Sequence, residues 1–547
     1  MYSTNWNISS FFHKFQIRNN ANGHQFNTIS SMKRLISFIV ANMIMLSAWC
    51  QTALFYNNGA SVYMMPGSYM IVNNDSLHNS QGLIQNAGDL RVAGDIINDA
   101  GALLTGGPVT STGLYDIGGN WANSGTFTAY RDSVMLNGPT TPGGIQLITG
   151  TQISAFYDLI LAGTPGSSKA QTLNATVSNI LDLRTDELAT QQNEMLVLNT
   201  SPAAITQSGT QPAIGYVSSL GNGTLSRATN STSAYIFPTG TPSALVSSTT
   251  PFYYRPIDFS PTNSASNIYG ARLVDNPDSD TYLVEHYDDS LCKVNPHYYH
   301  RLYHSGGSSS ANLTMYFDPS ADGYWTDMAH WGAPRSNKWN YMGVSNEGSG
   351  YGFTSVEIPN WSRFTPDPFA LAAKKFIVNA GPNQNVPIHE TVQLNAYIST
   401  NPSNISSIIW APDTFLSDNT IANPTYTAIQ TTEYIIVVTD QAGCVARDTI
   451  TMSVLPDILL IPTAFSPNGD GKNDLFRPLN PNLKTLVFRV YDRWGVLVYE
   501  TDVIGDGWDG TYKNMKQDLG VYVWQAQYSL TGINETFTAS GNVTLVR

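Results

Sequence analysis

Oxygen-bearing side chains crowd one short segment near the C-terminus, where residues 468–474 read Asn-Gly-Asp-Gly-Lys-Asn-Asp. A hard cation such as Ca²⁺ needs several oxygen ligands on a backbone that can curl, and the two glycines permit that curvature. We expect Asn468, Asp470 and Asp474 to be the ligands of such an ion. The spacing is not that of an EF-hand, because Lys472 stands where a third acidic ligand would be. A tight turn held by side-chain-to-backbone hydrogen bonds explains the same residues, so both interpretations stay open.

A second group of possible metal ligands lies closer to the N-terminus. It comprises His286, Cys292, His297, His300 and His304. Imidazole and thiolate groups bind transition metals, but on a strand His300 and His304 would share one face while His297 would lie on the other. No CxxC or HExxH pattern accompanies them. We therefore expect surface or half-buried histidines of a β-strand.

Motifs that would identify an enzyme are missing from the sequence. It contains no Gly-x-Ser-x-Gly, no P-loop, no glycine fingerprint of a dinucleotide-binding fold and no HExxH. Scattered carboxylates could pair in space as in a glycosidase, but their spacing along the chain does not identify such a pair. We therefore expect a non-enzymatic protein. The alternative is a secreted polysaccharide-degrading enzyme, since solenoids and sandwiches both host such chemistry.

Four Asp-Ser/Thr-aliphatic triplets resemble the O-glycosylation acceptor pattern of exported Bacteroidetes proteins. The acceptor residues would be Ser76, Ser133, Ser290 and Thr449. A three-residue pattern also arises by chance, so ordinary turn and strand residues are the alternative at each position.

The elements that must position these residues are β-strands. After Gln51, apolar residues almost never recur at helical spacing, whereas short alternating runs bounded by Gly, Asn, Asp, Ser and Pro recur throughout. Within residues 51–257, turn formers repeatedly precede short apolar strands, as in the segments that begin at Asn79, Asn98 and Asn123. Such units suit the corners and strands of a β-solenoid, whose stacked rungs bury one another's faces. Their uneven spacing leaves a sandwich of short strands as the alternative.

Three immunoglobulin-like β-sandwich domains are expected to follow, so the predicted fold class is all-β and multidomain. Residues 258–373 carry many aromatic residues on alternating strands. Residues 374–456 contain Trp410-Ala-Pro and the strand Tyr434-Ile-Ile-Val-Val-Thr-Asp. These segments resemble a PKD-like domain, which implies that Trp410 packs between two sheets. Residues 457–547 form the last domain.

The beginning of the chain predicts export. The basic segment Met32-Lys33-Arg34 is followed by a mostly apolar, uncharged run up to Ala48. Its length and flank are those of a signal-peptide core, and it is too short to span a bilayer comfortably. We expect residues 32–50 to be removed as a signal peptide, with acylation of Cys50 in a lipoprotein as the alternative. We expect residues 1–31 to be a non-native extension.

Composition limits the partners and the cross-links. The net charge is −13 without a basic cluster, so nucleic acid and anionic lipid surfaces are poor candidate partners. Outside the predicted signal peptide the chain has only Cys292 and Cys444. They lie in different predicted domains, so no disulfide framework is expected. Cys444 is expected to be a free thiol, because the partner cysteine of many PKD-like relatives is missing.

Five motifs follow one another in the last domain. They are Ala-Phe-Ser-Pro-Asn-Gly-Asp-Gly-Lys-Asn-Asp at 464–474, Tyr-Asp-Arg-Trp-Gly at 491–495, Gly-Trp-Asp-Gly-Thr at 507–511, Gly-Val-Tyr-Val-Trp at 520–524 and the terminal strand 541–547. In this order they resemble the gliding-motility-associated C-terminal domain, the type B sorting domain of the type IX secretion system of Bacteroidetes. The residues that carry the resemblance are Phe465, Pro467, Asn468, Asp470, Gly471, Asn473, Asp474, Asp492, Arg493, Trp494, Gly495, Trp508, Asp509 and Gly510.

This resemblance implies an export address. After Sec-dependent removal of the signal peptide, the folded C-terminal domain would engage the type IX machinery, and the protein would be secreted or held at the outer-membrane surface. From the residues alone, Trp494 and Trp508 are core residues of a small sandwich; the resemblance adds that their turns form the recognised surface. We expect the upstream β-structure to be displayed for adhesion or gliding, with glycans or other cell-surface components as partners. A purely architectural role in the surface layer is a further alternative.

Overall fold

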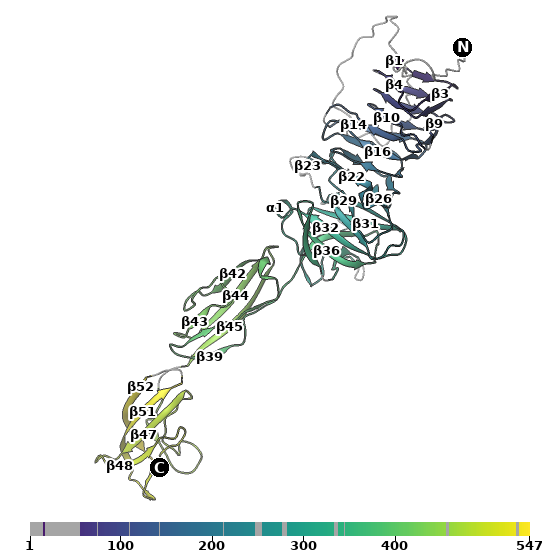
Figure 1. Cartoon of the computed structure of the whole chain (residues 1–547). Helices are drawn as coiled ribbons and strands as arrows, with labels where there is room; N and C mark the ends of the chain where they lie inside the picture. The colour runs from purple at the N-terminus through teal and green to yellow at the C-terminus, as the bar shows by residue number, and fades with distance from the viewer. Residues whose placement is uncertain are drawn as a thin grey trace. The chain divides into compact units, whose positions relative to one another are not determined.

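The computed structural model describes most of the chain after residue 54, and its elements are labelled as in Figure 1. The described residues are 15–16, 55–73, 75–108, 110–141, 143–211, 213–246, 254–275, 282–332, 337–343, 345–455, 459–531 and 535–547. The predicted signal peptide lies outside these ranges. Within them the helical segments are α1 (Pro319–Asp322), η1 (Pro202–Ala204) and η2 (Pro402–Asn404), and none is long and apolar enough to cross a membrane. The remaining regular structure is strand, which confirms the all-β class.

The first part of the chain is a three-sided β-solenoid (Figure 1). Strands three apart in the chain are neighbours in one sheet, as expected when each turn of the coil contributes three strands. One side runs β1-β4-β7-β10-β13-β16-β19-β22, the next runs β2-β5-β8-β11-β14-β17-β20-β25, and the third consists of β3-β6-β9-β12 followed by β15-β18-β21. Every pair along these sides is parallel. The predicted solenoid is confirmed, and a sandwich is wrong for this region.

The solenoid strands are short. They are β1 (Phe15–Gln16), β2 (Phe55–Asn57), β3 (Ser61–Met64), β4 (Tyr69–Val72), β5 (Leu77–Asn79), β6 (Leu83–Asn86), β7 (Asp89–Val92), β8 (Ile96–Asn98), β9 (Leu103–Gly106), β10 (Leu114–Ile117), β11 (Trp121–Asn123), β12 (Thr126–Thr128), β13 (Ser133–Leu136), β14 (Ile145–Gly150), β15 (Ser154–Phe156), β16 (Asp158–Leu161), β17 (Ser168–Gln171), β18 (Ala175–Val177), β19 (Leu181–Asp182), β20 (Glu187–Ala189), β21 (Glu194–Val197), β22 (Ile205–Thr206) and β25 (Tyr216–Ser218). Many of these strands bury every second residue, as β7 does with Leu90 and Val92.

Buried asparagines form a column along one corner of the coil. Asn57 donates to Asn79 Oδ1 at 2.9 Å, Asn79 to Asn98 Oδ1 at 3.0 Å, and Asn98 to Asn123 Oδ1 at 2.8 Å. The first three side-chain amides each donate to the next asparagine, and such pairing is what a buried polar group requires. The column ends at Asn123 because the next rung has Gly150 at that position.

The solenoid continues without a break into the first sandwich. Strand β26 (Thr224–Thr229) pairs in parallel with β21 on one side and antiparallel with β29 on the other. One sheet therefore runs β15-β18-β21-β26-β29-β31-β37-β33-β34, with β30 beside β37, and the second is β27-β28-β32-β36-β35. Both β26 and β27 precede residue 258, so antiparallel pairing begins upstream of the domain start expected from the sequence.

The strands of this sandwich are longer than those of the solenoid. They are β27 (Tyr235–Phe237), β28 (Ile257–Pro261), β29 (Asn267–Asp275), β30 (Leu291–Val294), β31 (Tyr298–Gly306), β32 (Ala311–Phe317), β33 (Asp327–Trp331), β34 (Trp339–Tyr341), β35 (Asn346–Gly350), β36 (Phe353–Trp361) and β37 (Pro368–Lys374). A short hairpin, β23 (Gly209–Thr210) and β24 (Ala213–Ile214), lies apart from both sheets. Aromatic residues fill the interior, which includes the edge-to-face pair Trp331 and Trp339 at 5.5 Å between ring centroids.

A second compact unit comprises Lys375–Arg547. Its first domain has a four-stranded sheet, β39-β45-β44-β42, and the pairs β38-β41 and β40-β43. The strands are β38 (Val378–Asn379), β39 (Gln384–Pro387), β40 (Thr391–Gln393), β41 (Tyr397–Ile398), β42 (Ile405–Ala411), β43 (Thr425–Thr427), β44 (Thr432–Asp440) and β45 (Val445–Leu455). Trp410 is fully buried in a core with Leu394, Tyr426 and Tyr434. The expected packing of Trp410 in the domain interior is confirmed.

The cysteines differ from the expectation. Cys292 lies on β30 and Cys444 precedes β45, and both are disulfide-bonded. A free thiol at Cys444 is therefore wrong. That expectation rested only on the missing partner cysteine of the PKD-like pattern, which says nothing of a partner outside that pattern.

The last domain is built on a five-stranded sheet of order β46-β52-β51-β47-β48. Its strands are β46 (Ala464–Phe465), β47 (Leu483–Tyr491), β48 (Leu497–Thr501), β51 (Gly520–Leu530) and β52 (Thr536–Leu545), beside the hairpin β49 (Thr511–Tyr512) and β50 (Met515–Lys516). Inward residues pack on Phe476 and Trp508, whose backbones exchange hydrogen bonds of 2.8 and 2.9 Å. Phe476 and Trp508, which lie in loops, cover the inner face of the sheet.

Candidate functional site

The segment 468–474 is a turn that its own side chains hold closed. The carboxylate of Asp474 accepts hydrogen bonds from the amides of Asn468, Gly469 and Gly471 at 3.0, 2.7 and 2.8 Å. These amides, that of Gly469 foremost, hold the pKa of Asp474 below its usual range. Gly469 and Gly471 adopt positive φ angles, which is why glycine is suited to both positions.

The same contacts weigh against a cation in this turn. Asn468 Oδ1 accepts from the amide of Asp470 at 3.0 Å, and Asp470 Oδ1 accepts from that of Lys472 at 2.8 Å. Both oxygens of Asp474 are also engaged by amides. A Ca²⁺ ion would have to displace these bonds. The residues as arranged form the closed turn, and Ca²⁺ binding at Asn468, Asp470 and Asp474 stays a prediction.

The Asp-Arg-Trp-Gly motif forms the turn between β47 and β48. Asp492 Oδ1 accepts from the amides of Trp494 at 2.8 Å and Val496 at 2.9 Å, and Gly495 has φ +81°. The Trp494 side chain points away from the core, and the residue is 81% exposed. The prediction that Trp494 is a core residue is wrong, because it sits at the tip of the hairpin where no second layer covers it. The Arg493 guanidinium lies 5.9 Å from its ring centroid.

The prediction of a core position is confirmed for Trp508. It is fully buried, and its Nε1 donates to the carbonyl oxygen of Thr511 at 2.7 Å. Asp509 Oδ1 accepts from the Thr511 amide and hydroxyl. At Gly510, φ is +73° and an added Cβ would lie 3.0 Å from Pro467. Glycine at this position therefore lets two of the motifs pack closely.

The sheet register brings the motifs to one end of the domain. Strands β46 and β52 end side by side, with Phe465 opposite Leu545. Strand β51 begins there, with Gly520 also opposite Leu545, and β47 ends there, with Tyr491 opposite Val523. The connecting turns at this end comprise residues 466–474, 492–496 and 505–519.

An exposed apolar surface covers the outer face at this end, and we call it the tip patch. Its members are Trp494, Val496, Leu497, Leu519, Val521 and Val523. Each is at least 37% exposed, and Leu497 and Val523 both lie opposite Tyr491 in the sheet. Farther along β51 the outward residues are Gln525 and Gln527. The outward residues of β51 are therefore apolar beside the motifs and polar farther along the strand.

Residues 459–545 match the model of the CHU_C type IX secretion signal domain. The tip patch and the three turns all belong to this secretion signal domain. The match supports export through the type IX secretion system. No curated protein matches the chain.

Solved structures resemble the chain only weakly. The N-terminal eight Ig domains of Down Syndrome Cell Adhesion Molecule align at 10% identity with a TM-score of 0.18, over 53% of this chain and 45% of that one. Latent PorU from Porphyromonas gingivalis aligns at 10% identity and a TM-score of 0.13, over 53% and 31%. The glucan-locus protein SGBP-B of Bacteroides ovatus, solved with a mixed-linkage heptasaccharide, aligns at 11% identity and a TM-score of 0.11, over 53% and 80%. The chain thus spans less than half of the first of these.

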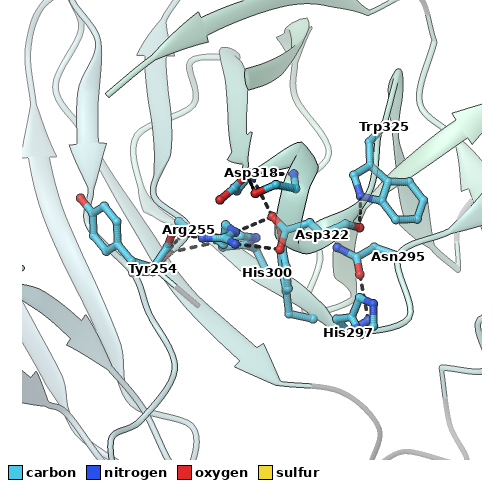
Figure 2. A network of polar contacts seen from close by, with 11 residues as sticks. Tyr254, Arg255, Asn295, His297, His300, Asp318, Asp322 and Trp325 are labelled. Atoms are coloured by element: carbon cyan, nitrogen blue, oxygen red, sulfur yellow. Dashed lines mark hydrogen bonds and ion pairs between the residues drawn. The ribbon is translucent and has the colours of Figure 1, made fainter. Parts of the chain in front are cut away.

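Upstream of the secretion signal domain, a dense polar network lies inside the first sandwich (Figure 2). Arg255 Nε and Nη2 donate to the two oxygens of Asp322 at 2.5 and 2.7 Å. Asp322 also accepts from the Tyr298 hydroxyl at 3.1 Å and the Asp318 amide at 2.8 Å. Arg255 and Asp322 are only 2% and 3% exposed. The network ties α1 to the strands, and in it the charges of Arg255 and Asp322 are engaged with each other.

Within the described residues, the histidines form no group of three or more ligands that could hold a metal ion. His300 is buried, its Nε2 lies 3.0 Å from the carbonyl oxygen of Arg255, and burial lowers its pKa to about 4. A surface or half-buried position is therefore wrong for His300, which faces the sandwich interior. His304 stacks on Tyr269 at 4.5 Å between ring centroids, and the amide of His297 donates to the side chain of Asn295.

The four possible glycosylation residues differ in access. Ser76 is buried, and its hydroxyl accepts from the amide of Asp95 at 2.9 Å. Ser133 is half-buried and donates to Asp158 at 3.2 Å. Ser290 and Thr449 are exposed. An enzyme acting on the folded protein would reach these last two.

Proposed function

We propose that this chain is a non-enzymatic protein exported by the type IX secretion system, and that the tip patch with its three turns is the surface the secretion machinery recognises. The observation that carries the proposal is the exposed Trp494 inside the matched domain. A large apolar side chain in water is unfavourable for a free domain and is typical of a binding surface. Trp and Arg are also the residue types that most often dominate binding energy.

The destination follows from the same domain. Export by this route leads to the medium or to the outer-membrane surface, after the expected signal peptide of residues 32–50 is removed. There the solenoid and sandwiches would be displayed, with adhesion or gliding as the proposed role and glycans or other surface components as partners. A long β-solenoid suits such a role because it presents many weak contacts at once.

Buried carboxylates support a non-enzymatic role over the polysaccharide-degrading alternative. Asp322 is held by Arg255. Asp258 is 3% exposed and accepts from the hydroxyls of Tyr316 at 2.9 Å and Tyr351 at 3.2 Å. Each of these carboxylates is engaged with protein groups, whereas a glycosidase pair must face its substrate.

Substitution within the tip patch tests the recognition surface. Trp494→Ser removes the exposed indole without touching the core, so the melting temperature of the protein should stay unchanged while the secreted fraction falls. Gln527→Ser, on the same outer face but away from the motifs, is the matched control and should be secreted normally. The proposal is wrong if Trp494→Ser is secreted as efficiently as Gln527→Ser.

A further inference from the structure

The second side of the solenoid buries a lysine against an aspartate. Lys169 on β17 and Asp186, which precedes β20, both have fully buried side chains, and Nζ lies 3.8 Å from Oδ1. Strands β17 and β20 are parallel neighbours with Ser168 opposite Glu187, so Asp186 lies beside Ser167 of the adjacent rung. Lysine is almost never fully buried unless it is paired.

Ser167 connects the two groups. Lys169 Nζ donates to Ser167 Oγ at 3.2 Å and to the carbonyl oxygen of Gly138. Ser167 Oγ in turn donates to Asp186 Oδ1. Among the described residues, Asp186 Oδ2 has no hydrogen-bond partner. A Cβ added at Gly163 would lie 2.8 Å from Lys169 Nζ and 2.6 Å from Ser167 Oγ, so the backbone closes tightly over the amine.

Burial shifts both groups toward their neutral forms. Burial lowers the pKa of Lys169 and raises that of Asp186. A neutral amine has two N–H bonds and one lone pair. Gly138 and Ser167 accept those two N–H bonds, which leaves the lone pair for the carboxyl group of Asp186.

We propose that Lys169 and Asp186 condense into an intramolecular amide that links two neighbouring rungs of the solenoid. The lone pair of Nζ attacks Cγ of the protonated carboxyl group, and a C–N bond forms. Ser167 relays a proton from Nζ to the departing oxygen, the C–O bond breaks, and water leaves. The step changes no oxidation state and needs no co-reactant. The product replaces two buried ionisable groups with one neutral amide and stands independently of the proposed export.

Peptide mapping of the full-length protein tests the bond directly. Trypsin cleaves after Lys and Arg, and an unlinked chain gives separate peptides 132–169, 170–184 and 185–227. The amide blocks cleavage at Lys169, so the expected product is peptide 132–184 joined to peptide 185–227, lighter than their sum by one water molecule. Fragment ions should place the junction on Lys169 and Asp186. Recovery of only the unlinked peptides from denatured, reduced protein would overturn the proposal.

Two variants separate the chemistry from the fold. Asp186→Ala removes the acceptor, and only unlinked peptides should then appear. Ser167→Ala keeps both reacting groups and removes the relay, so the linked fraction measured at intervals after refolding should rise several-fold more slowly. An unchanged rate in Ser167→Ala would overturn the role of Ser167, and a linked peptide in Asp186→Ala would overturn the assignment of the bond. The wild-type map decides the central point even if a variant fails to fold.

Discussion

Removing Asp322 should be among the most destabilising single changes in the first unit. Asp322→Ala leaves the Arg255 guanidinium buried at 2% exposure without its bidentate partner. It also removes the acceptor of the Tyr298 hydroxyl and the Asp318 amide. Breaking a buried pair by removing one partner costs about 3–5 kcal/mol. Two further donors lose their acceptor, which places the expected loss of stability near the upper end, about 4–5 kcal/mol.

Calorimetry of the full-length protein measures this loss as a shift of the transition that belongs to the first unit. A loss of this size should lower that melting temperature by roughly 5–15 °C. Asp89→Ala is the matched control, because Asp89 pairs with Arg91 at 3.5 Å with both side chains about half exposed, and such pairs contribute about 0–1 kcal/mol. The double variant Arg255→Met with Asp322→Leu should recover most of the loss, since apolar replacement of a buried pair is often neutral or stabilising. A shift for Asp322→Ala no larger than that for Asp89→Ala would refute the reasoning.

Two further predictions concern ionisable groups. The melting temperature of the protein should not change between EDTA and millimolar Ca²⁺, because the oxygens of Asp474 are already engaged by amides; a rise with Ca²⁺ that Asp474→Asn abolishes would show a cation site instead. Burial raises the pKa of Asp132 from 3.8 to about 6, so its contribution to stability is fully present below about pH 4 and is lost as pH rises through 6. The first unit should therefore lose less stability between pH 5 and 7 in Asp132→Asn than in wild type, and equal losses in urea titrations would count against the burial of this charge.

The solenoid could be predicted from its corner residues, but its period could not. The sequence shows Asn79, Asn86, Asn98 and Asn123 at uneven intervals. In the structure Asn79, Asn98 and Asn123 stack in one column, whereas Asn86 ends a strand of another side. Turn loops of different length separate the rungs, and backbone pairing across the rungs tolerates this variation. The intervals between asparagines in the sequence therefore combine residues that belong to two different corners of the coil.

The candidate site could be predicted in part. Local motifs predict where the turns lie, but they do not predict which turn residues are buried by the rest of the domain. Asp474 and Asp492 accept amides within their own turns, and such short-range contacts can be expected from Asn, Asp and Gly. Trp494 and Trp508 have similar neighbours in the sequence, yet one is exposed and the other is buried. Which of them lies over the sheet depends on long-range register. The pair Arg255 and Asp322 is separated by 67 residues and has no local signal.

Deletion of residues 457–547 followed by cell fractionation tests the central claim most directly. The shortened chain keeps the expected signal peptide of residues 32–50, the solenoid and two sandwiches, so it should still leave the cytoplasm. The account predicts that full-length protein reaches the cell surface or the medium, while the shortened chain accumulates in the periplasm in a protease-resistant, folded form. Appearance of the shortened, folded chain at the surface or in the medium at the level of the full-length protein would contradict it.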